Sequence, residues 1–165
     1  MNIVAICRWL DDTHLAAAIR EWAGLFAIIE TFHVIALVQV VGSIFLIDLR
    51  LMGLASRKHS VREMIGEILP YTWTGFVVAA ISGALMFTSK ATQYYENFSF
   101  RMKMLLLAIA GINMLAFHVL TYRHVADWDR GTTSVAAKFA GGLSIVLWIG
   151  IVSFGRWIGF TILPI

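Results

Sequence analysis

Four long apolar runs are the feature of this 165-residue sequence that most constrains its fold. They cover residues 22–48, 71–89, 103–122 and 138–161, with few ionisable side chains inside them. The hydrocarbon core of a bilayer takes about 20 apolar residues as an α-helix, and backbone polar groups in lipid must be paired within the protein. The runs therefore predict an all-α fold, a transmembrane four-helix bundle in a single integral membrane domain over residues 1–165.

The composition supports a membrane protein and excludes several functional classes. Hydrophobic residues make up 59% of the chain and charged residues only 14%, whereas a soluble domain carries about 25% charged residues. The net charge of +3 comes without a basic face or a recognition motif, so nucleic acid is not an expected partner. The expected partner is the lipid bilayer, whose anionic headgroups attract loop lysines and arginines. Nucleophile, phosphate-loop, zinc-protease and dinucleotide motifs are absent, so soluble-enzyme chemistry finds no support.

The N-terminal residues 2–20 predict an amphipathic interfacial helix, or a pair of such helices, on the membrane surface. The apolar residues expected to enter the lipid are Ile3, Ile6, Cys7, Trp9 and Leu10. Arg8 and Asp11 would face water, and these charges also argue against a secretory signal peptide. Asp12 or Thr13 is positioned to cap a second helical start at His14.

The loops between the runs predict how the chain is oriented. Basic residues are more numerous in the loops 50–69 and 123–137 than on the opposite side, which favours those loops as cytoplasmic. Both termini would then face the periplasm of a multi-pass protein in a bacterial inner membrane.

Pro70 is expected at the start of the second run, where a proline loses no needed hydrogen bond. Residues 90–103 are expected to form an interfacial loop with an aromatic belt.

Three ionisable residues inside the runs predict a polar cluster. Glu30 and His33 are three residues apart and so share one helix face, and Arg156 approaches the same side of the membrane from the last run. Because a charge inside the bilayer costs at least about 2.5 kcal/mol, an ion pair of Glu30 with Arg156 is expected. The alternative is that Arg156 snorkels to the surface and Glu30 is neutral.

A second group of polar residues lies near the opposite side of the membrane. It comprises Asp48, Arg50, His59, His118 and Tyr122. These residues would form either a network of caps and salt bridges or an interfacial site for a metal, a haem propionate or a lipid headgroup.

His33 and His118 suggest haem ligation, because they are the two histidines inside the runs and lie on different helices. A membrane b-type haem is held by axial histidines of this kind, and basic residues such as Arg50 would hold its propionates. The spacing opposes the simplest version, since Asp48 lies 15 residues after His33 but Arg123 only five after His118. Three alternatives remain. A single histidine could ligate the haem, histidine and methionine could bind copper, or the histidines could be purely structural.

Glycines inside or near the runs, including Gly155 and Gly159 in a GxxxG spacing, predict either close helix packing or gaps that admit a flat cofactor or a partner helix.

Several segments resemble small bacterial four-helix membrane proteins related to the copper-resistance membrane subunit CopD and to b-type membrane cytochromes. The segments are 33–37 (HVIAL), 48–53 (DLRLMG), 82–87 (SGALMF), 117–118 (FH) and 155–160 (GRWIGF). The resemblance implies that His33 and His118 ligate haem b or a metal, with copper the alternative cofactor. Glu30 and Arg156 would orient the group or balance its charge.

The expected function is an integral membrane subunit that binds b-type haem or a metal for electron relay or copper handling. A membrane or periplasmic protein, or a second copy of the chain, would be its partner. The alternative is a non-catalytic structural or accessory subunit of a membrane complex.

Overall fold

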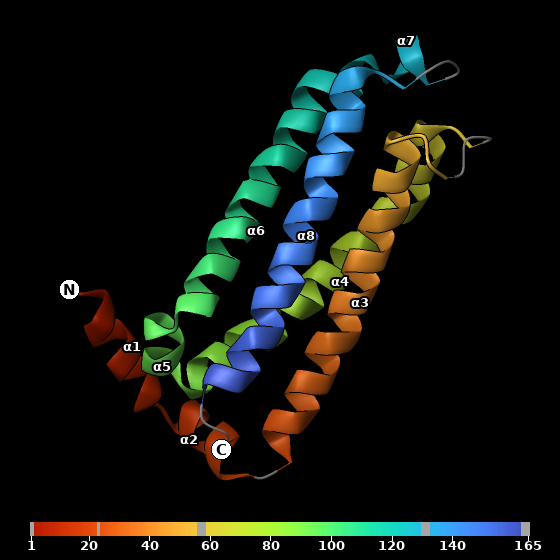
Figure 1. Cartoon of the computed structure of the whole chain (residues 1–165). Helices are drawn as coiled ribbons and strands as arrows, with labels where there is room; N and C mark the ends of the chain where they lie inside the picture. Colours follow the sequence, from red (N-terminus) through yellow and green to blue (C-terminus); the bar gives the residue numbers. More distant parts are fainter. Residues whose placement is uncertain (1, 23, 56–58, 130–132, 163–165) are drawn as a thin grey trace.

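The computed structural model describes residues 2–22, 24–55, 59–129 and 133–162 of the chain. Within these ranges every regular element is helical, and four helices are long and apolar enough to cross a membrane (Figure 1). The spans are α3 (Leu25–Leu51), α4 (Val61–Ser89), α6 (Phe98–Ala116) with its continuation to Trp128, and α8 (Val135–Thr161). The prediction of an all-α transmembrane four-helix bundle is confirmed.

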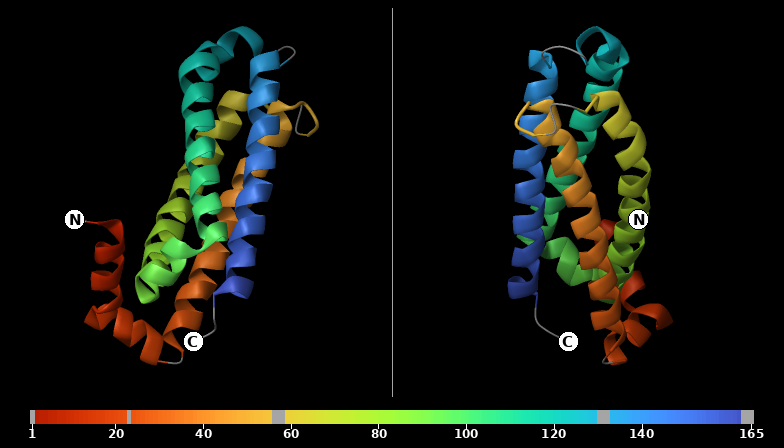
Figure 2. Two further views of the ribbon diagram at one scale, coloured as in Figure 1. Left: turned by 60° about the vertical axis from the view of Figure 1, so that its left-hand side comes forward. Right: turned by 90° about the vertical axis from the view of Figure 1, so that its right-hand side faces the viewer.

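The four spans pack as a series rather than as a closed ring. Helix α3 packs against α4 on one side and against α8 on the other, and α8 packs against α6 (Figures 1 and 2). The two outer members of the series, α4 and α6, share no comparable packing. One buried cluster lies midway along the bundle between α3 and α8 and contains Val40, Trp148 and Ile151. A larger one joins α3, α4, α8 and the continuation of α6, and its buried residues are Leu51, Val61, Ile65, Phe117, Val125 and Ala137.

Two glycines allow the spans to approach α3 closely. A Cβ atom at Gly75 of α4 would lie 3.0 Å from Val40 Cγ2 and 3.3 Å from the Ala36 carbonyl oxygen. A Cβ atom at Gly141 of α8 would lie 3.0 Å from the Asp48 carbonyl oxygen. The packing interpretation of the glycines is confirmed at these two positions, because small residues let membrane helices approach closely. No atom lies within 4 Å of the corresponding position at Gly159.

Helix α4 begins at Val61, well before the predicted start near residue 71, so Pro70 lies inside the helix rather than at its start. The prediction of its place was wrong, because the helix runs through the proline although the missing N–H of Pro70 removes the helical bond to the Gly66 carbonyl. Carbonyl groups on the following turn accept additional side-chain bonds. The Thr74 hydroxyl donates to the Pro70 carbonyl at 2.9 Å, and Gln39 Nε2 of α3 donates to the Tyr71 carbonyl at 2.7 Å. Proline is tolerated in membrane helices when side chains and neighbouring helices supply such bonds.

The third span begins at Phe98, so the predicted start at residue 103 was also too late. Asn97 caps the helix by accepting a hydrogen bond from the Phe100 amide at 3.1 Å. Lys103 therefore lies inside the span and not in the preceding loop. Beyond Ala116 the span continues through a π-helical turn, η1 (Phe117–Thr121), a 3₁₀ turn, η2 (Tyr122–His124), and α7 (Val125–Trp128).

Two short N-terminal helices pack on the end of the bundle where α4 ends. They are α1 (Ile3–Asp11) and α2 (His14–Glu21), and they contact α4 and the short helix α5 (Ala91–Glu96) (Figure 2). The Asp11 carboxylate accepts from the Ala91 and Thr92 amides at 2.5 and 3.2 Å, and Arg20 donates to the Ser89 carbonyl at 2.7 Å. The N-terminal segment is therefore tied to the bundle by directional bonds.

The predicted faces of the N-terminal segment are only partly correct. Ile3 and Trp9 are exposed, as an apolar face turned to lipid requires. Cys7, which was expected to enter the lipid, is only 3% exposed because α1 packs on α5. Thr13 caps α2 as predicted, accepting a hydrogen bond from the Ala16 amide at 3.2 Å.

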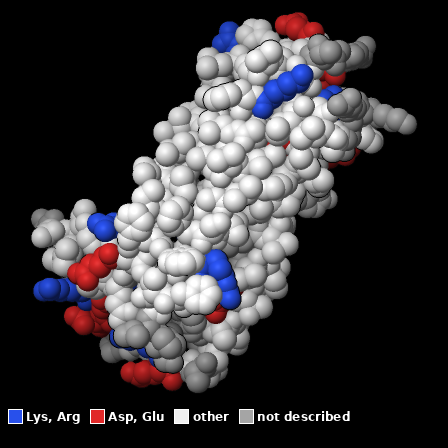
Figure 3. All heavy atoms as spheres, in the orientation of Figure 1, with Lys and Arg blue, Asp and Glu red and all other residues white. Residues whose placement is uncertain are grey.

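Charged side chains gather at the two ends of the molecule, and the face shown in Figure 3 is uncharged between them. Large apolar side chains such as Ile35, Val38 and Ile112 are exposed on the long helices. Such a band costs free energy in water and none in hydrocarbon. The chain is therefore a multi-pass membrane protein.

At the end opposite α1, the loop after α7 caps α4. The Asp129 carboxylate accepts hydrogen bonds from the Ser60 hydroxyl at 2.5 Å and from the amides of Val61 and Arg62 at 2.6 and 3.4 Å. Desolvation alone would raise the pKa of Asp129. These hydrogen bonds and the positive charge of Arg50 outweigh it and hold the pKa below its usual value.

Asp129→Ala is expected to destabilise the protein by about 1 kcal/mol, because α4 loses its cap. The contribution of Asp129 is fully present above about pH 3.9, the unfolded carboxyl pKa, and is lost as the pH falls through the lower folded pKa. Denaturation of the detergent-solubilised protein at pH 7 and pH 3 measures both effects. Asp127→Asn, at a nearby exposed position, is the control. An Asp129→Ala protein as stable as the control at pH 7 would contradict this role.

Candidate functional site

A cavity of about 470 Å³ lies inside the bundle between α4 and α6, backed by α3 and α8. We refer to it as the lateral cavity. Its walls are mainly aliphatic and aromatic, and they include Ile44, Phe76, Leu107, Met114 and Trp148. Each of the four spans contributes to the lining, so the cavity is a product of the tertiary fold and not of one sequence motif.

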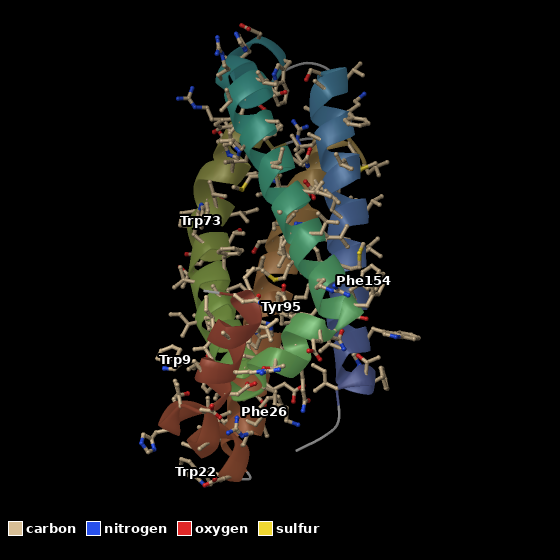
Figure 4. The ribbon with its side chains drawn as sticks, turned by 90° about the vertical axis from the view of Figure 1, so that its left-hand side faces the viewer. Trp9, Trp22, Phe26, Trp73, Tyr95 and Phe154 are labelled. Atoms are coloured by element: carbon tan, nitrogen blue, oxygen red, sulfur yellow. The ribbon has the colours of Figure 1, made fainter. Side chains whose placement is uncertain are left out.

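The cavity lies where the series of packed helices is incomplete. Helices α4 and α6 border it, with Trp73 on the α4 side (Figure 4). These two helices share little backbone packing, although Phe87 of α4 stacks on Phe100 of α6 with ring centroids 5.3 Å apart. In a membrane this side of the bundle faces acyl chains. The cavity is only partly enclosed by the protein.

The polar lining residues of the lateral cavity come from different spans. They are Asp48, Thr72, Asn113, His118 and Ser144. Asp48 is only 5% exposed, and the Ser144 hydroxyl hydrogen-bonds to its carboxyl group. The other carboxyl oxygen, Oδ2, has no hydrogen-bond partner among the described residues. Since buried polar groups are nearly always paired, this oxygen marks a place where a partner is missing.

The other polar groups of the cavity are held by bonds to backbone carbonyls. Asn113 Nδ2 donates to the Ala140 carbonyl at 3.0 Å, and the Thr72 hydroxyl donates to the Ile68 carbonyl at 3.1 Å. His118 Nδ1 lies 2.9 Å from the Met114 carbonyl oxygen. A carbonyl oxygen only accepts, so Nδ1 carries the proton and Nε2 of the neutral ring is an acceptor. His118 belongs to the π-helical turn η1, a distortion often found at functional sites.

Asp48 and His118, two members of the predicted second polar group, thus line one cavity. Thr72, Asn113 and Ser144 were not predicted as site residues. The only sequence signal was a hydroxyl or amide side chain within each of three otherwise apolar runs.

Arg50 and His59 of the same predicted group lie elsewhere. Arg50 is 5% exposed, and its Nε donates to the His59 carbonyl at 2.8 Å and its Nη1 to the Thr133 hydroxyl at 3.3 Å. These bonds tie the α3–α4 connection to the segment before α8. Arg50 is therefore a structural link in the loops, and it does not line the lateral cavity.

His33 is bound to the neighbouring helix α4. Its Nδ1 lies 3.0 Å from Ser82 Oγ, and the Ser82 hydroxyl donates to the Val78 carbonyl at 2.6 Å. Because the Ser82 proton is used in that bond, His33 Nδ1 is the donor to Ser82. The imidazole also packs on Gly83, where an added Cβ would lie 3.1 Å from His33 Cε1.

The structure does not bring His33 and His118 together. Phe117, next to His118, packs with Leu51 at the far end of α3. Leu51 lies 18 residues beyond His33, or about 27 Å along the helix axis at 1.5 Å per residue. Axial ligands on either side of one haem must lie at nearly the same depth. A haem bridged by these two histidines therefore does not fit the structure.

The predicted Glu30–Arg156 ion pair is not formed between these two described residues. Arg156 is exposed and lies 5.3 Å from the centroid of the Phe160 ring, a cation–π contact. Glu30 is exposed on α3.

Burial, together with the charge of Glu30, raises the pKa of Tyr94 in α5. The basic residue beside α8 inside the bundle is Lys103, whose Nζ would lie 3.7 Å from a Cβ at Gly155.

The ligand set for a metal is limited. The described residues contain no group of three or more histidine, cysteine, aspartate or glutamate side chains placed to hold one ion. Of the two predicted ligands, His118 lines a cavity and His33 is engaged with Ser82. Of these two histidines, only His118 is therefore placed to contact a bound molecule in the lateral cavity.

These features define a class of protein, a four-span helical membrane protein with a largely apolar cavity between its spans. Residues 6–161 match DUF6644, a family of unknown function, and the chain belongs to that family. Neither the search of curated proteins nor that of solved structures found a match.

Ser82→Ala is expected to destabilise the protein by about 0.6 kcal/mol, the average for a hydrogen bond between membrane helices. Thr88→Ala on the same helix is the matched control, because the Thr88 hydroxyl bonds only to the Ala84 carbonyl of its own helix. Unfolding in detergent with increasing denaturant measures the difference. Equal stabilities of the two variants would show that the His33–Ser82 contact does not hold α3 to α4.

Proposed function

We propose that this membrane protein binds a lipophilic small molecule that enters the lateral cavity from the bilayer. The observation that carries the proposal is the combination of apolar walls, a few convergent polar groups and sparse backbone packing between α4 and α6. Ligand pockets in proteins have volumes of about 300–1,000 Å³ and this same mixture of apolar walls and a few polar groups. A volume of about 470 Å³ suits one chain or ring system of modest size.

Photolabelling tests this proposal directly. The protein in phosphatidylcholine nanodiscs is irradiated with a hexadecyl methyl ether that carries a diazirine in its chain, and the labelled residues are mapped by mass spectrometry. Saturable labelling concentrated on cavity residues of α4 and α6, such as Leu69 and Leu107, is expected. Labelling spread evenly over lipid-facing residues such as Val38 and Ile112, without saturation, would overturn the proposal.

A second candidate is a b-type haem held by His118 alone, as the resemblance to CopD and b-type cytochromes suggests. It is favoured by the hydrogen bond of Nδ1 to the Met114 carbonyl, since such a bond fixes a ligating histidine and directs the other ring nitrogen to the metal. When bound, haem would supply one-electron transfer. An absorption spectrum of the purified protein tests this candidate: a Soret band that His118→Ala removes and His33→Ala retains supports it, and colourless protein excludes it. Metal analysis of the same sample tests copper.

We further propose that both termini face the periplasm of a bacterial inner membrane. Helix α1 and the end of α8 lie at the same end of the bundle (Figure 1), and the loops at the other end carry more basic residues. A C-terminal alkaline phosphatase fusion is expected to be active. An inactive phosphatase fusion together with a fluorescent C-terminal green fluorescent protein fusion would reverse the orientation.

A further inference from the structure

We propose that the lateral cavity selects lipophilic molecules whose head group donates hydrogen bonds, namely a primary amine or a hydroxyl. This inference rests on the proposed binding function and adds the class of ligand. The inference follows from the hydrogen-bond donors and acceptors of the lining side chains that are not already used in bonds within the protein.

The groups that Asp48, Thr72, Asn113 and His118 leave available are mainly acceptors, whereas the indole N–H groups of Trp73 and Trp148, which also line the cavity, are donors. Asp48 offers the unpartnered Oδ2, and Asn113 offers its amide oxygen because Nδ2 is bonded to Ala140. His118 offers Nε2, and Thr72 offers the lone pairs of a hydroxyl whose proton is used in the bond to Ile68. With Asp48 ionised, the second amide hydrogen of Asn113 is the one donor that these four side chains retain. A head group that only accepts hydrogen bonds would therefore leave most of these groups unpaired.

Unpaired polar groups in a dry site determine which ligands are rejected. A buried donor or acceptor without a partner costs about 1–3 kcal/mol, so a site built of acceptors discriminates strongly between a donor head and an isosteric head without donors. A primary ammonium carries three N–H donors and also supplies the opposite charge that an ionised carboxyl inside a membrane requires. A hydroxyl supplies one donor without charge.

The test compares four competitors with the same hexadecyl chain. Hexadecylamine has donors and a charge, hexadecanol has a donor alone, hexadecyltrimethylammonium has a charge alone, and hexadecyl methyl ether has neither. Each competes with the diazirine-bearing methyl ether for labelling in phosphatidylcholine nanodiscs, at equal and low mole fractions in the bilayer. Because the reporter has no donor in its head, its binding tests the proposed function and the ranking of competitors tests the inference.

The amine and the alcohol are each expected to compete at least about tenfold more effectively than the methyl ether, and trimethylammonium no better than the ether. An amine stronger than the alcohol would assign the natural ligand to the amines, and the reverse order to the alcohols. The inference would be overturned if all four compounds competed with the reporter equally well, or if hexadecyltrimethylammonium competed as well as hexadecylamine. Either result would leave the proposed function intact. Labelling without saturation would overturn the proposed function itself.

Two variants locate the selectivity. Asp48→Leu removes the unpartnered acceptor and is expected to reduce the preference for the donor heads to less than about threefold. Because Asp48 is buried and its replacement can prevent folding, His118→Phe provides a second test. His118 bonds only to the Met114 carbonyl of its own helical segment, so this variant keeps the contacts between spans and should still lower the preference. The inference would be overturned if a folded His118→Phe protein kept the full preference for donor head groups. Any Asp48→Leu protein that folds would have to keep that preference as well.

Discussion

Gly111→Phe is expected to reduce saturable labelling by the methyl ether reporter at least about tenfold, because a phenyl ring would occupy the space that the ligand needs. Gly111 lines the lateral cavity, and an added Cβ would meet no atom within 4 Å. The substitution therefore introduces its Cβ without a clash and adds a phenyl ring at the wall of the cavity. Photolabelling of the variant in the same nanodiscs measures the effect.

Gly42→Phe is the matched control for this cavity-filling variant. Gly42 is exposed on α3, has no atom within 4 Å of an added Cβ and does not line the cavity. It should retain the labelling of the unmodified protein. Equal labelling of the two variants would mean that the reporter binds outside the lateral cavity.

Gly141→Ala is expected to destabilise the bundle by about 1–3 kcal/mol, the usual range for overpacking a well-packed core. The added methyl group would lie 3.0 Å from the Asp48 carbonyl oxygen and 3.2 Å from Leu51 Cβ, so α8 must move away from α3. Since Asp48 belongs to the cavity lining, the same shift should also weaken labelling by the reporter. Denaturation in detergent and photolabelling measure the two consequences.

The adjacent glycine gives the control for this prediction. At Gly142 an added Cβ would meet only the end of the Met52 side chain, at 3.8 Å, which is ordinary van der Waals contact. Gly142→Ala should therefore leave stability unchanged or raise it, since alanine favours helix by about 1 kcal/mol over glycine. If the two alanine variants were equally stable, the close approach of α8 to α3 would have no energetic role.

The number and class of the spans could be predicted because hydrophobicity over 20 residues is a strong local signal. Their ends were harder to predict, since they depend on partners far away in sequence. The cap that Asp129 provides to α4 comes from a loop 68 residues away, and a proline inside the span hid the true start. Likewise, the Asn97 cap moves the start of α6 so that Lys103 falls inside the helix rather than in the loop before it.

The candidate site was less predictable, because depth and helix rotation decide which side chains meet. Unequal spacings already argued against a pair of His33 and His118, and the packing of Phe117 with Leu51 agrees with that argument. The residues Thr72 and Ser144 carry no motif, and only the tertiary fold places them beside Asp48 around one cavity. Sequence reasoning found the titratable members of the site and missed the neutral ones, because only charge stands out in an apolar run.

The most direct test of the account is the lipid content of the purified protein. Protein extracted in a mild detergent from cell membranes is analysed by mass spectrometry beside its Gly111→Phe variant. We expect one lipophilic molecule with an amine or hydroxyl head at near-stoichiometric amount in the unmodified protein and its loss from the variant. Identical lipid profiles for the two proteins would contradict a ligand site between α4 and α6.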